Sequence, residues 1–386
     1  MPLLARKKII LVKIESTYGI DPTPTGAANA IWAKNINITP IDADKAKRDL
    51  FTGWLGNTQE LQGGFRVSMD FEVEMAGSGT AGTAPAWGPL MRACGHAETL
   101  VAAAVTGTAQ AGTTTTLTLA ASGTSSTDDA YVGLPVSITG GTGSGQSNFI
   151  VAYNGTTKVA TMAYPFTTAP GASSGYSVGP GAVYKPIDLN TESATIYLYI
   201  DGRLHKLTGA RGTVTVSMAS KAIPTLKFAI TGLFNQPTDA AGPTPTYTPF
   251  QVPLMVNAVN TPLVNVQSFG AVMSAFTLEQ VATVTFRNPA GGTEQVLQTN
   301  RESTGSITIE DTTVAAKDWW TAIKQSTLGG LAITHGTAAG NKVSVTAGQV
   351  QISAPQGSDE DSIQMQGLTL GFVPSAVSRD YYITAH

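Results

Sequence analysis

Residues 66–95 read RVSMDFEVEMAGSGTAGTAPAWGPLMRACG, and this stretch decides the fold. Its first part alternates apolar residues with polar or acidic ones, which is the pattern of a strand with one buried face. The apolar face holds Met69, Phe71, Val73 and Met75, and the acidic face holds Asp70, Glu72 and Glu74. We therefore expect a core strand that presents a ladder of carboxylates on its other side.

A short helix is expected after the glycine-rich loop from Gly77 to Thr83. Its apolar residues recur at i, i+3, i+4 and i+7, so they share one helix face. They are Trp87, Leu90, Met91 and Cys94. Gly95 can end the helix in a left-handed conformation, and we interpret Cys94 as a small core residue rather than a reactive thiol.

The composition favours an all-β protein of several domains. The chain has 386 residues, with 41 Gly, 21 Pro and only 13% charged residues, which suits many strands and turns. This length predicts roughly two or three domains. The net charge of −3 and the pI near 5.8 argue against a protein that grips nucleic acid, but they allow one that lets DNA pass. The single cysteine excludes an internal disulfide framework.

No segment is predicted to export the chain or to cross a membrane. A basic stretch precedes the apolar run Ile9–Val12, but this run ends at Lys13, and no cleavage site of small residues follows. We interpret Lys8–Glu15 as a first strand. No run approaches the ~20 apolar residues that span a bilayer, so we expect no membrane partner.

The next strand is expected to change face. Its apolar residues lie on one side up to Ala33 and on the other from Ile36, which predicts a bulge near Asn35. Between Thr39 and Gly64 we expect a long polar connection, either a solvated loop or a contact loop. Its charged residues include Asp42, Asp44, Lys45, Lys47, Arg48 and Asp49.

Residues 101–182 differ in composition and are predicted to form an inserted domain. Their only charged residues are Asp128, Asp129 and Lys158, and Thr, Gly, Ala and Ser dominate. Short alternating runs separated by turn residues predict a small β-sandwich. These runs are 114–119, 132–138, 148–153 and 159–163.

Beyond the insertion, the predicted strands and helix follow the same order as in the first part of the chain. Strands are predicted at 194–200, 212–218 and 226–231, with a tight turn at Asp201-Gly202. A proline-rich linker follows at 236–260. Residues 306–310 then alternate again before a second short helix.

The second helix resembles the first in its apolar face. Aligning Trp87 with Trp319 places Met91 beside Ile323. We expect Asp311 or Thr312 to cap this helix and Gly329-Gly330 to end it. The residues expected to share its face are Ala316, Trp319, Trp320, Ile323 and Thr327.

These patterns predict two copies of one fold. The first copy comprises 1–100 and 183–235, and the second comprises 261–386. The expected fold class is all-β with short flanking helices, namely tandem β-sandwich or barrel repeats plus the inserted β-sandwich domain.

No constellation of residues predicts an enzyme. Gly140 to Ser147 has the glycine spacing of a phosphate-binding loop, but Gln146 replaces the lysine and a strand is expected where that motif requires a helix. The four histidines lie apart from other metal-ligand residues, so no metal and no cofactor are expected. The acidic ladder could supply a glycosidase pair, but such pairs usually come from different elements, and an electrostatic role is preferred.

Two stretches resemble the tail tube (major tail) proteins of long-tailed bacteriophages. They are ESTYGIDP at 15–22 and FEVEMAGSGTAGTAPAWGPLMRACG at 71–95. The resemblance implies a virion protein built on a β-sandwich with a flanking helix. Its strands would join those of neighbouring subunits in a barrel, and stacked rings would form the tube through which DNA enters the host.

The same resemblance implies the partners. The family usually presents six such folds per ring, so two per chain predict a trimer with pseudo-sixfold symmetry, with a hexamer as the alternative. A tape measure protein and tail-end proteins are implied, as is assembly in the host cytoplasm. The competing interpretation is a secreted or surface carbohydrate-binding β-protein, suggested by the Thr/Ser/Gly-rich insertion.

Within this interpretation, three sets of residues receive roles. A carboxylate-lined channel would repel DNA phosphates over a Debye length of about 8 Å. The predicted channel-lining residues are Asp70, Glu72, Glu74, Thr308 and Glu310. The loops 39–64 and 288–304 are predicted to bridge successive rings, and the predicted inter-ring contacts are the six charged residues from Asp42 to Asp49 in the first loop. Core packing is predicted for Trp87, Leu90, Met91, Cys94, Trp319 and Ile323.

Overall fold

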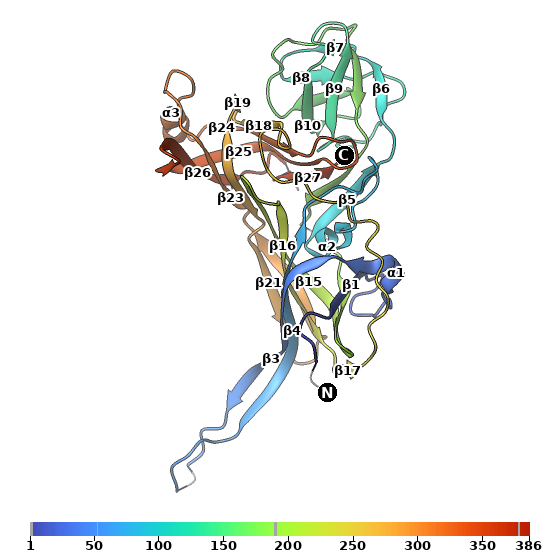
Figure 1. Ribbon diagram of the computed structural model, residues 1–386, viewed down its shortest axis with the longest axis vertical. Helices are drawn as coiled ribbons and strands as arrows, with labels where there is room; N and C mark the ends of the chain where they lie inside the picture. Colours follow the sequence, from blue (N-terminus) through green and yellow to red (C-terminus); the bar gives the residue numbers. More distant parts are fainter. Residues whose placement is uncertain (1–2, 52, 189–190, 377–378) are drawn as a thin grey trace.

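The computed structural model describes residues 3–51, 53–188, 191–376 and 379–386. This part of the chain is mostly strand, with three short helices, so the predicted all-β class is confirmed. An elongated body carries a separate lobe at one end and a long hairpin at the other (Figure 1). None of the helices in the described ranges is long and apolar enough to cross a membrane.

The body begins with the N-terminal elements of the chain. These are β1 (Lys8–Ile14), α1 (Gly26–Asn29), β2 (Ala30–Ile31), β3 (Ala33–Lys47), β4 (Glu60–Glu74), α2 (Gly88–Ala93) and β5 (His96–Val101). After the separate lobe the body continues with β13 (Gly181–Pro186), β14 (Ala194–Ile200), β15 (Arg203–Ala219), β16 (Thr225–Phe234) and β17 (Thr238–Asp239).

A second set of elements follows an extended segment. These are β18 (Leu263–Val266), β19 (Phe269–Gly270), β20 (Met273–Glu279), β21 (Ala282–Arg287), β22 (Gln295–Arg301), β23 (Thr304–Glu310), α3 (Trp319–Lys324), β24 (Leu328–His335), β25 (Val343–Glu360), β26 (Ile363–Phe372) and β27 (Tyr382–Ala385).

Both sets pair their strands in the same order. In the first the order is β3–β4–β16–β15–β14–β1. In the second it is β20–β23–β26–β25–β24–β18. In addition, β20 pairs with Thr215–Ala219 at the end of β15, so one sheet runs through both sets.

The alternating residues of this sheet build one apolar core. Phe71 of β4, Phe228 of β16, Phe276 of β20 and Ile307 of β23 are all buried in the same cluster. The rings of Phe71 and Phe228 lie 5.6 Å apart. The apolar face predicted for β4 therefore packs on its neighbours across the sheet.

Two local predictions about turns and bulges are confirmed. The pairing of β3 with β4 shifts between Lys34 and Asn37, and Asn35 has a φ of 54°. The turn between β14 and β15 uses Asp201 at φ 43° and Gly202 at φ 100°. Two consecutive positive φ angles are characteristic of the tight hairpin turn that Asp-Gly favours.

The predicted connection from Thr39 to Gly64 is wrong over most of its length. Residues 39–47 continue β3 and residues 60–64 begin β4, so the loop is confined to 48–51 and 53–59 of the described residues. Backbone pairing between the strands holds this ribbon, from Asp42 opposite Arg66 to Lys47 opposite Glu60. Neither of its faces is continuously apolar, and the strand signal is therefore missing from the sequence.

The predicted limits of the second short helix are also wrong. Its cap is Asp318, whose Oδ1 accepts a hydrogen bond from the Thr321 backbone N–H at 2.8 Å, rather than Asp311 or Thr312. Gly329-Gly330 lies inside β24 and does not end the helix. The helix begins only where Trp319 reaches the core.

Residues 105–178 form a sheet of their own, which is the lobe at the top of Figure 1. Its strands are β6 (Val105–Thr108), β7 (Ala111–Gly112), β8 (Thr116–Thr118), β9 (Pro135–Gly140), β10 (Ser147–Tyr153), β11 (Val159–Met162) and β12 (Gly175–Val178). They pair in the order β6–β12–β9–β10–β11–β8–β7 around an apolar cluster. Arg379 anchors this lobe to the body, with its Nη2 at 2.6 Å from Asp129 Oδ1.

Candidate channel face and assembly surfaces

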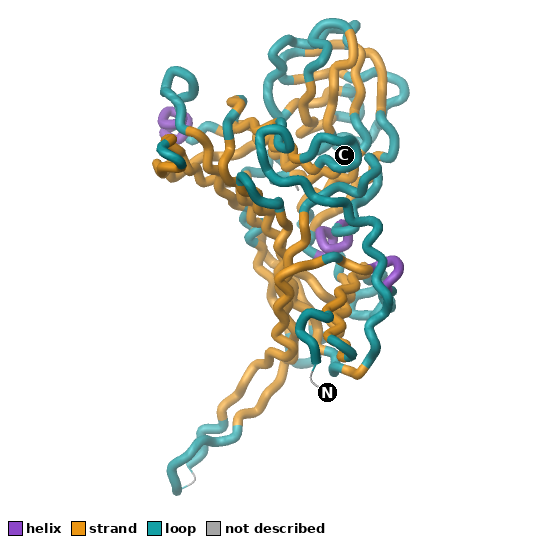
Figure 2. The backbone as a smooth tube through the Cα atoms, viewed as in Figure 1, coloured by secondary structure: helices purple, strands orange, loops and turns teal. Residues whose placement is uncertain are grey.

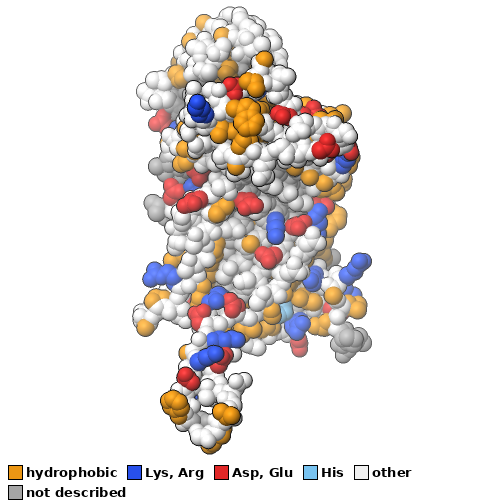
Figure 3. Space-filling view, turned by 90° about the vertical axis from the view of Figure 1, so that its left-hand side faces the viewer, with side chains coloured by type: hydrophobic (Ala, Val, Ile, Leu, Met, Phe, Trp, Pro, Cys, Tyr) orange, Lys and Arg blue, Asp and Glu red, His pale blue; other side chains and the backbone are white. Residues whose placement is uncertain are grey.

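One face of the large sheet is open to solvent and concave in outline (Figures 1 and 2). Figure 3 views this face directly and shows mostly uncharged side chains with scattered charges of both signs. The carboxylates predicted on β4 belong to its solvent side. Asp70 is exposed, and Glu72 and Glu74 are half-buried.

Lysines flank the acidic ladder and offset part of its charge. Glu72 lies opposite Lys34 of β3 and Lys227 of β16. Lys34 Nζ lies 3.4 Å from Glu74 Oε1. Asp70 instead lies opposite Asn37 and Ala229, so it has no basic residue directly across either neighbouring strand.

The second predicted lining pair lies on β23. Thr308 pairs with Ala275 and Gly367, and Glu310 pairs with Met365. Both side chains are half-buried. Glu310 lies at the end of β23, close to the turn between β25 and β26.

The helix α2 packs against the core side of the sheet. Trp87, Leu90, Met91 and Cys94 are buried, and Trp87 Nε1 donates a hydrogen bond to the Ala76 carbonyl at 2.8 Å. Burial raises the pKa of the Cys94 thiol, which keeps it protonated and unreactive.

The counterpart helix α3 is less deeply packed. Trp319 is buried with its ring 5.7 Å from that of Phe269, whereas Ile323 is only partly buried.

The hairpin β3–β4 projects from the body as an arm, defined here as residues 40–66 (Figure 1). Arg66 forms ion pairs with Asp42 at 2.8 Å and with Asp44 at 3.0 Å, so these two predicted contact residues are held within the arm. Lys45, Lys47, Arg48 and Asp49 are exposed nearer its tip.

The tip of the arm carries an apolar group that charge patterning did not reveal. Leu50, Phe51, Trp54 and Leu55 are all exposed, and Phe51 and Leu55 are fully so. The sequence FTGWL at 51–55 was the available signal, because large apolar residues in a loop are unusual without a partner.

The other predicted contact loop, 288–304, contains β22 and is tied to the body. The Val296 N–H donates to Tyr18 Oη at 2.6 Å, and Arg211 Nη1 donates to the Val296 carbonyl at 2.7 Å. Gln298 Nε2 donates to the Gly212 carbonyl at 2.6 Å. The hairpin β21–β22 is therefore held against β15.

Two long strand edges of the sheet are open among the residues that the structure describes. β3 pairs with β4, and no other strand of the described ranges pairs with it. β24 and β26 lie on opposite sides of β25, but the pairing with β24 ends at Gln351 of β25, which lies opposite Leu328. The β25 edge beyond Ile352 is thus unpaired among the residues that the structure describes, and open edges of this length favour pairing with another chain.

A model of the family described as phage tail tube protein matches residues 5–373. The chain belongs to this family. It is accordingly a structural component of the virion tail, and the resemblance found in the sequence is confirmed. A search of the curated proteins finds no match.

In this tail tube protein the motif at 15–22 fastens the N-terminal segment to the sheet. Glu15 is buried and accepts four hydrogen bonds through its carboxylate. The donors are Ser193 Oγ at 2.6 Å, Thr195 Oγ1 at 2.7 Å, the Gly209 N–H at 2.7 Å and the Gly19 N–H at 2.8 Å. Asp21 in turn accepts hydrogen bonds from Tyr197 and Lys206.

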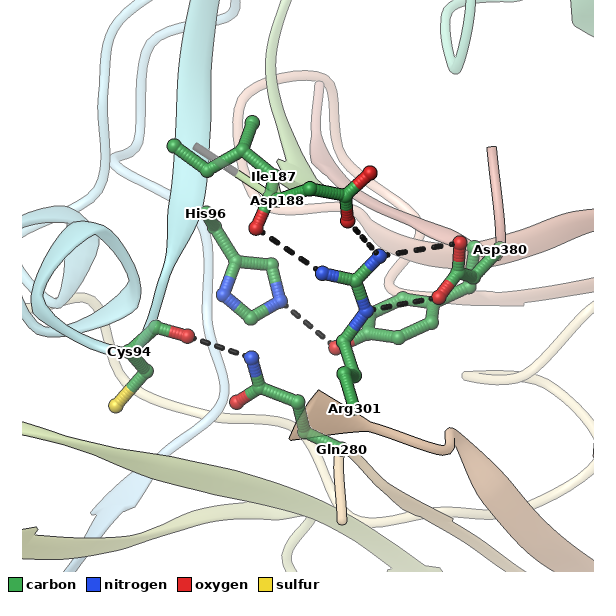
Figure 4. Close-up of polar contacts among 8 residues, drawn as sticks. Cys94, His96, Ile187, Asp188, Gln280, Arg301 and Asp380 are labelled. Atoms are coloured by element: carbon green, nitrogen blue, oxygen red, sulfur yellow. Dashed lines mark hydrogen bonds and ion pairs between the residues drawn. The ribbon is translucent and has the colours of Figure 1, made fainter. Parts of the chain in front are cut away.

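A buried polar network joins the two sets of strands (Figure 4). Arg301 Nε lies 2.9 Å from Asp380 Oδ2, and its Nη2 lies 2.9 Å from Asp188 Oδ1. His96 Nε2 lies 2.8 Å from Tyr381 Oη, and burial lowers the pKa of His96 to about 3. The imidazole is therefore neutral at pH 7 and acts as a structural hydrogen-bonding group.

The side chains in this network form hydrogen bonds and ion pairs with one another. Gln280 Nε2 donates to the Cys94 carbonyl at 2.6 Å and is itself buried. Within the described ranges, no group of three or more His, Cys, Asp or Glu side chains is placed to hold a metal ion.

Proposed function

We propose that three copies of this chain close a ring with pseudo-sixfold symmetry and that such rings stack into the tail tube. Each chain would supply two tail-tube domains, 1–100 with 183–235, and 261–386, joined by the linker 236–260. Residues 101–182 would form an outward domain. The observation that carries this proposal is the pair of open strand edges on a sheet whose two sets of strands follow one pairing order.

The register of closure can be derived from the junction inside the chain, where Ser217 of β15 faces Thr277 of β20. Ser217 pairs with Thr225 of β16, and Thr225 pairs with Glu74, the last residue of β4. In the second set, Ser358 of β25 pairs with Met365 of β26, and Met365 pairs with Glu310, the last residue of β23. Ser358 therefore occupies the place on its open edge that Ser217 occupies at the internal junction.

The same argument identifies the partner residue on β3. Thr277 faces Ser306, and Asn37 faces Asp70. Ser306 and Asp70 each lie four residues before the last residue of their strands. Asn37 thus corresponds to Thr277, and we expect Ser358 of one chain to face Asn37 of the next.

Cysteine cross-linking tests this closure. Directly opposed residues have Cβ atoms ~5 Å apart, close enough for a disulfide after small adjustments. The variant Asn37→Cys/Ser358→Cys should give covalent dimers and trimers on oxidation, ending at the trimer. The native Cys94 is buried and should not interfere. Native mass spectrometry would give the ring mass without oxidation.

A register-shifted control makes the result specific. Thr39→Cys/Ser358→Cys displaces one cysteine by two residues, to ~7 Å or more, and should cross-link far more slowly. Equal rates in the two variants would refute the register. A covalent ladder that continues to six chains would favour the hexamer over the trimer.

In such a ring the concave face of the sheet would line the channel for DNA. The residues proposed to line it are Asp70, Glu72, Glu74, Thr308 and Glu310. The small, sparsely charged side chains of this face support passage without specific binding, because phosphate contacts by Lys and Arg dominate affinity for DNA. A tape measure protein inside the tube and tail-end proteins would be further partners.

A further inference from the structure

We propose that the lobe, residues 105–178, is a clamp that fixes the second set of strands against the first. The lobe is inserted between β5 and β13, which are paired neighbours with Val101 opposite Gly181. β13 belongs to the first set and pairs on its other side with β27, which in turn pairs with β25 of the second set. The lobe therefore lies where the two sets meet (Figure 1).

The body completes the apolar core of the lobe. Val183 of β13 and Tyr382 of β27 are buried in the same cluster as the lobe's own side chains. Phe149 and Val151 of the lobe form another buried cluster with Ala332 of β24. The lobe thus buries apolar side chains of both sets, and its removal would expose them to water at a cost in free energy.

Polar contacts hold the lobe in one position. Thr384 Oγ1 of β27 donates a buried hydrogen bond to the Gly133 carbonyl at 2.8 Å. Arg379 contacts both carboxylate oxygens of Asp129, with Nη2 2.6 Å from Oδ1 and Nε 3.1 Å from Oδ2. A bidentate pair of this kind fixes the orientation of both groups. An interface that combines such contacts with apolar packing restrains the relative motion of two domains.

The lobe and β24 come into backbone contact at Gly330. Any side chain at this position would collide with the Ala163 carbonyl oxygen of the lobe. Gly371 of β26 lies in the same large sheet, but a methyl group added there would lie 4.0 Å from the Gln351 carbonyl oxygen, which is ordinary contact. The two glycines are therefore a matched pair of sites, one at the clamp and one away from it.

The outward surface of the lobe has few features that bind another molecule. No aromatic, Leu, Ile, Val or Met side chain of residues 105–178, all of which the structure describes, is exposed. Asp128 and Lys158, the charged residues of the lobe other than Asp129, form hydrogen bonds with backbone groups of the lobe itself. Partner-binding surfaces usually carry apolar patches or aromatic anchors. The side chains of the lobe that can make strong contacts are thus used within the chain.

Hydrogen exchange of the full chain tests the clamp directly. In Gly330→Ala the added methyl group would push the lobe away from β24. We therefore expect the amides of β24 and β27 to exchange roughly ten-fold faster than in the unaltered protein. Gly371→Ala should leave their exchange unchanged. Equal exchange of these strands in the two variants would overturn the clamp.

A shortened chain provides a second test. Asn-Gly can replace residues 102–180, because the opposed pair Val101 and Gly181 suits a two-residue hairpin turn. If the body requires the clamp, the shortened chain should lose the protection of β24 and β27 or fail to fold. An appendage could be removed without either loss, so unchanged exchange in the shortened chain would contradict the inference.

The last measurement concerns assembly and rests on the proposed trimeric ring, which closes regularly only if the two sets keep a fixed angle. We expect irregular tube diameters from Gly330→Ala in negative-stain images and regular tubes from Gly371→Ala. Regular tubes and normal exchange in the shortened chain, with lost attachment to host cells, would overturn the clamp and make the lobe an attachment domain. If no Asn37–Ser358 cross-linked trimer formed, the ring would be refuted, and hydrogen exchange would still decide the clamp.

Discussion

Glu15 illustrates how a single buried carboxylate can organise a segment. All four of its hydrogen-bond partners are donors. In Glu15→Gln, the amide NH₂ would face donors, leaving at least one buried group unsatisfied. We expect the free energy of unfolding to fall by about 2 kcal/mol, measured by urea denaturation of the monomer. Glu294→Gln, at an exposed turn, is the control and should change it by less than ~0.5 kcal/mol.

His96 should make stability depend on pH. Its pKa is about 3 in the folded chain because of burial, whereas an unfolded histidine has a pKa near ~6.5. Between these values the unfolded chain binds a proton that the folded chain does not, so stability falls as the pH falls. We expect His96→Asn to flatten this dependence between pH 4 and 6 by up to about 1.4 kcal/mol per pH unit. If the urea midpoints of the two proteins changed equally with pH, His96 would not be the source of the pH dependence.

The elements could be predicted from the sequence where burial is decided locally. In β4 the alternation from Met69 to Val73 defines the core face, because successive side chains of a strand point to opposite sides. The arm could not be predicted, because two paired strands in solvent bury no apolar face and leave no periodic signal. Its tip also carries exposed apolar residues, such as Phe51, which the charge pattern did not reveal.

Contacts that join distant segments could not be predicted from the sequence either. His96 meets Tyr381 across 285 residues, and Arg301 meets Asp188 across 113. No local pattern encodes such pairs, since they depend on how β5, β22 and the C-terminal segment come together. The cap of α3 shows the same limit. Both Asp311 and Asp318 are suitable residues, and only the burial of Trp319 selects the second.

In the proposed tube, the charge of the channel is a property that no single residue displays. The acidic residues predicted to form a ladder on β4 have basic neighbours, because Lys34 and Lys227 lie opposite Glu72 on the adjacent strands. The open face therefore carries less negative charge than β4 alone implies. In the proposed ring, repulsion of DNA would depend most on carboxylates without a basic neighbour, of which Asp70 is the clearest.

Asp70→Lys should make the proposed channel hold DNA rather than let it pass. The exchange breaks no ion pair, because Asn37 and Ala229 lie across from Asp70. It would place a ring of cations on the proposed lumen. We expect tubes of this variant to retain DNA in co-sedimentation at low salt and to release it as salt rises, since phosphate contacts release counterions. Thr156→Lys, on an exposed turn of the lobe formed by residues 105–178, adds a lysine away from the proposed channel. If tubes of both variants retained the same amount of DNA, Asp70 would lie outside the channel. A lysine added anywhere on the surface would then explain the binding of DNA.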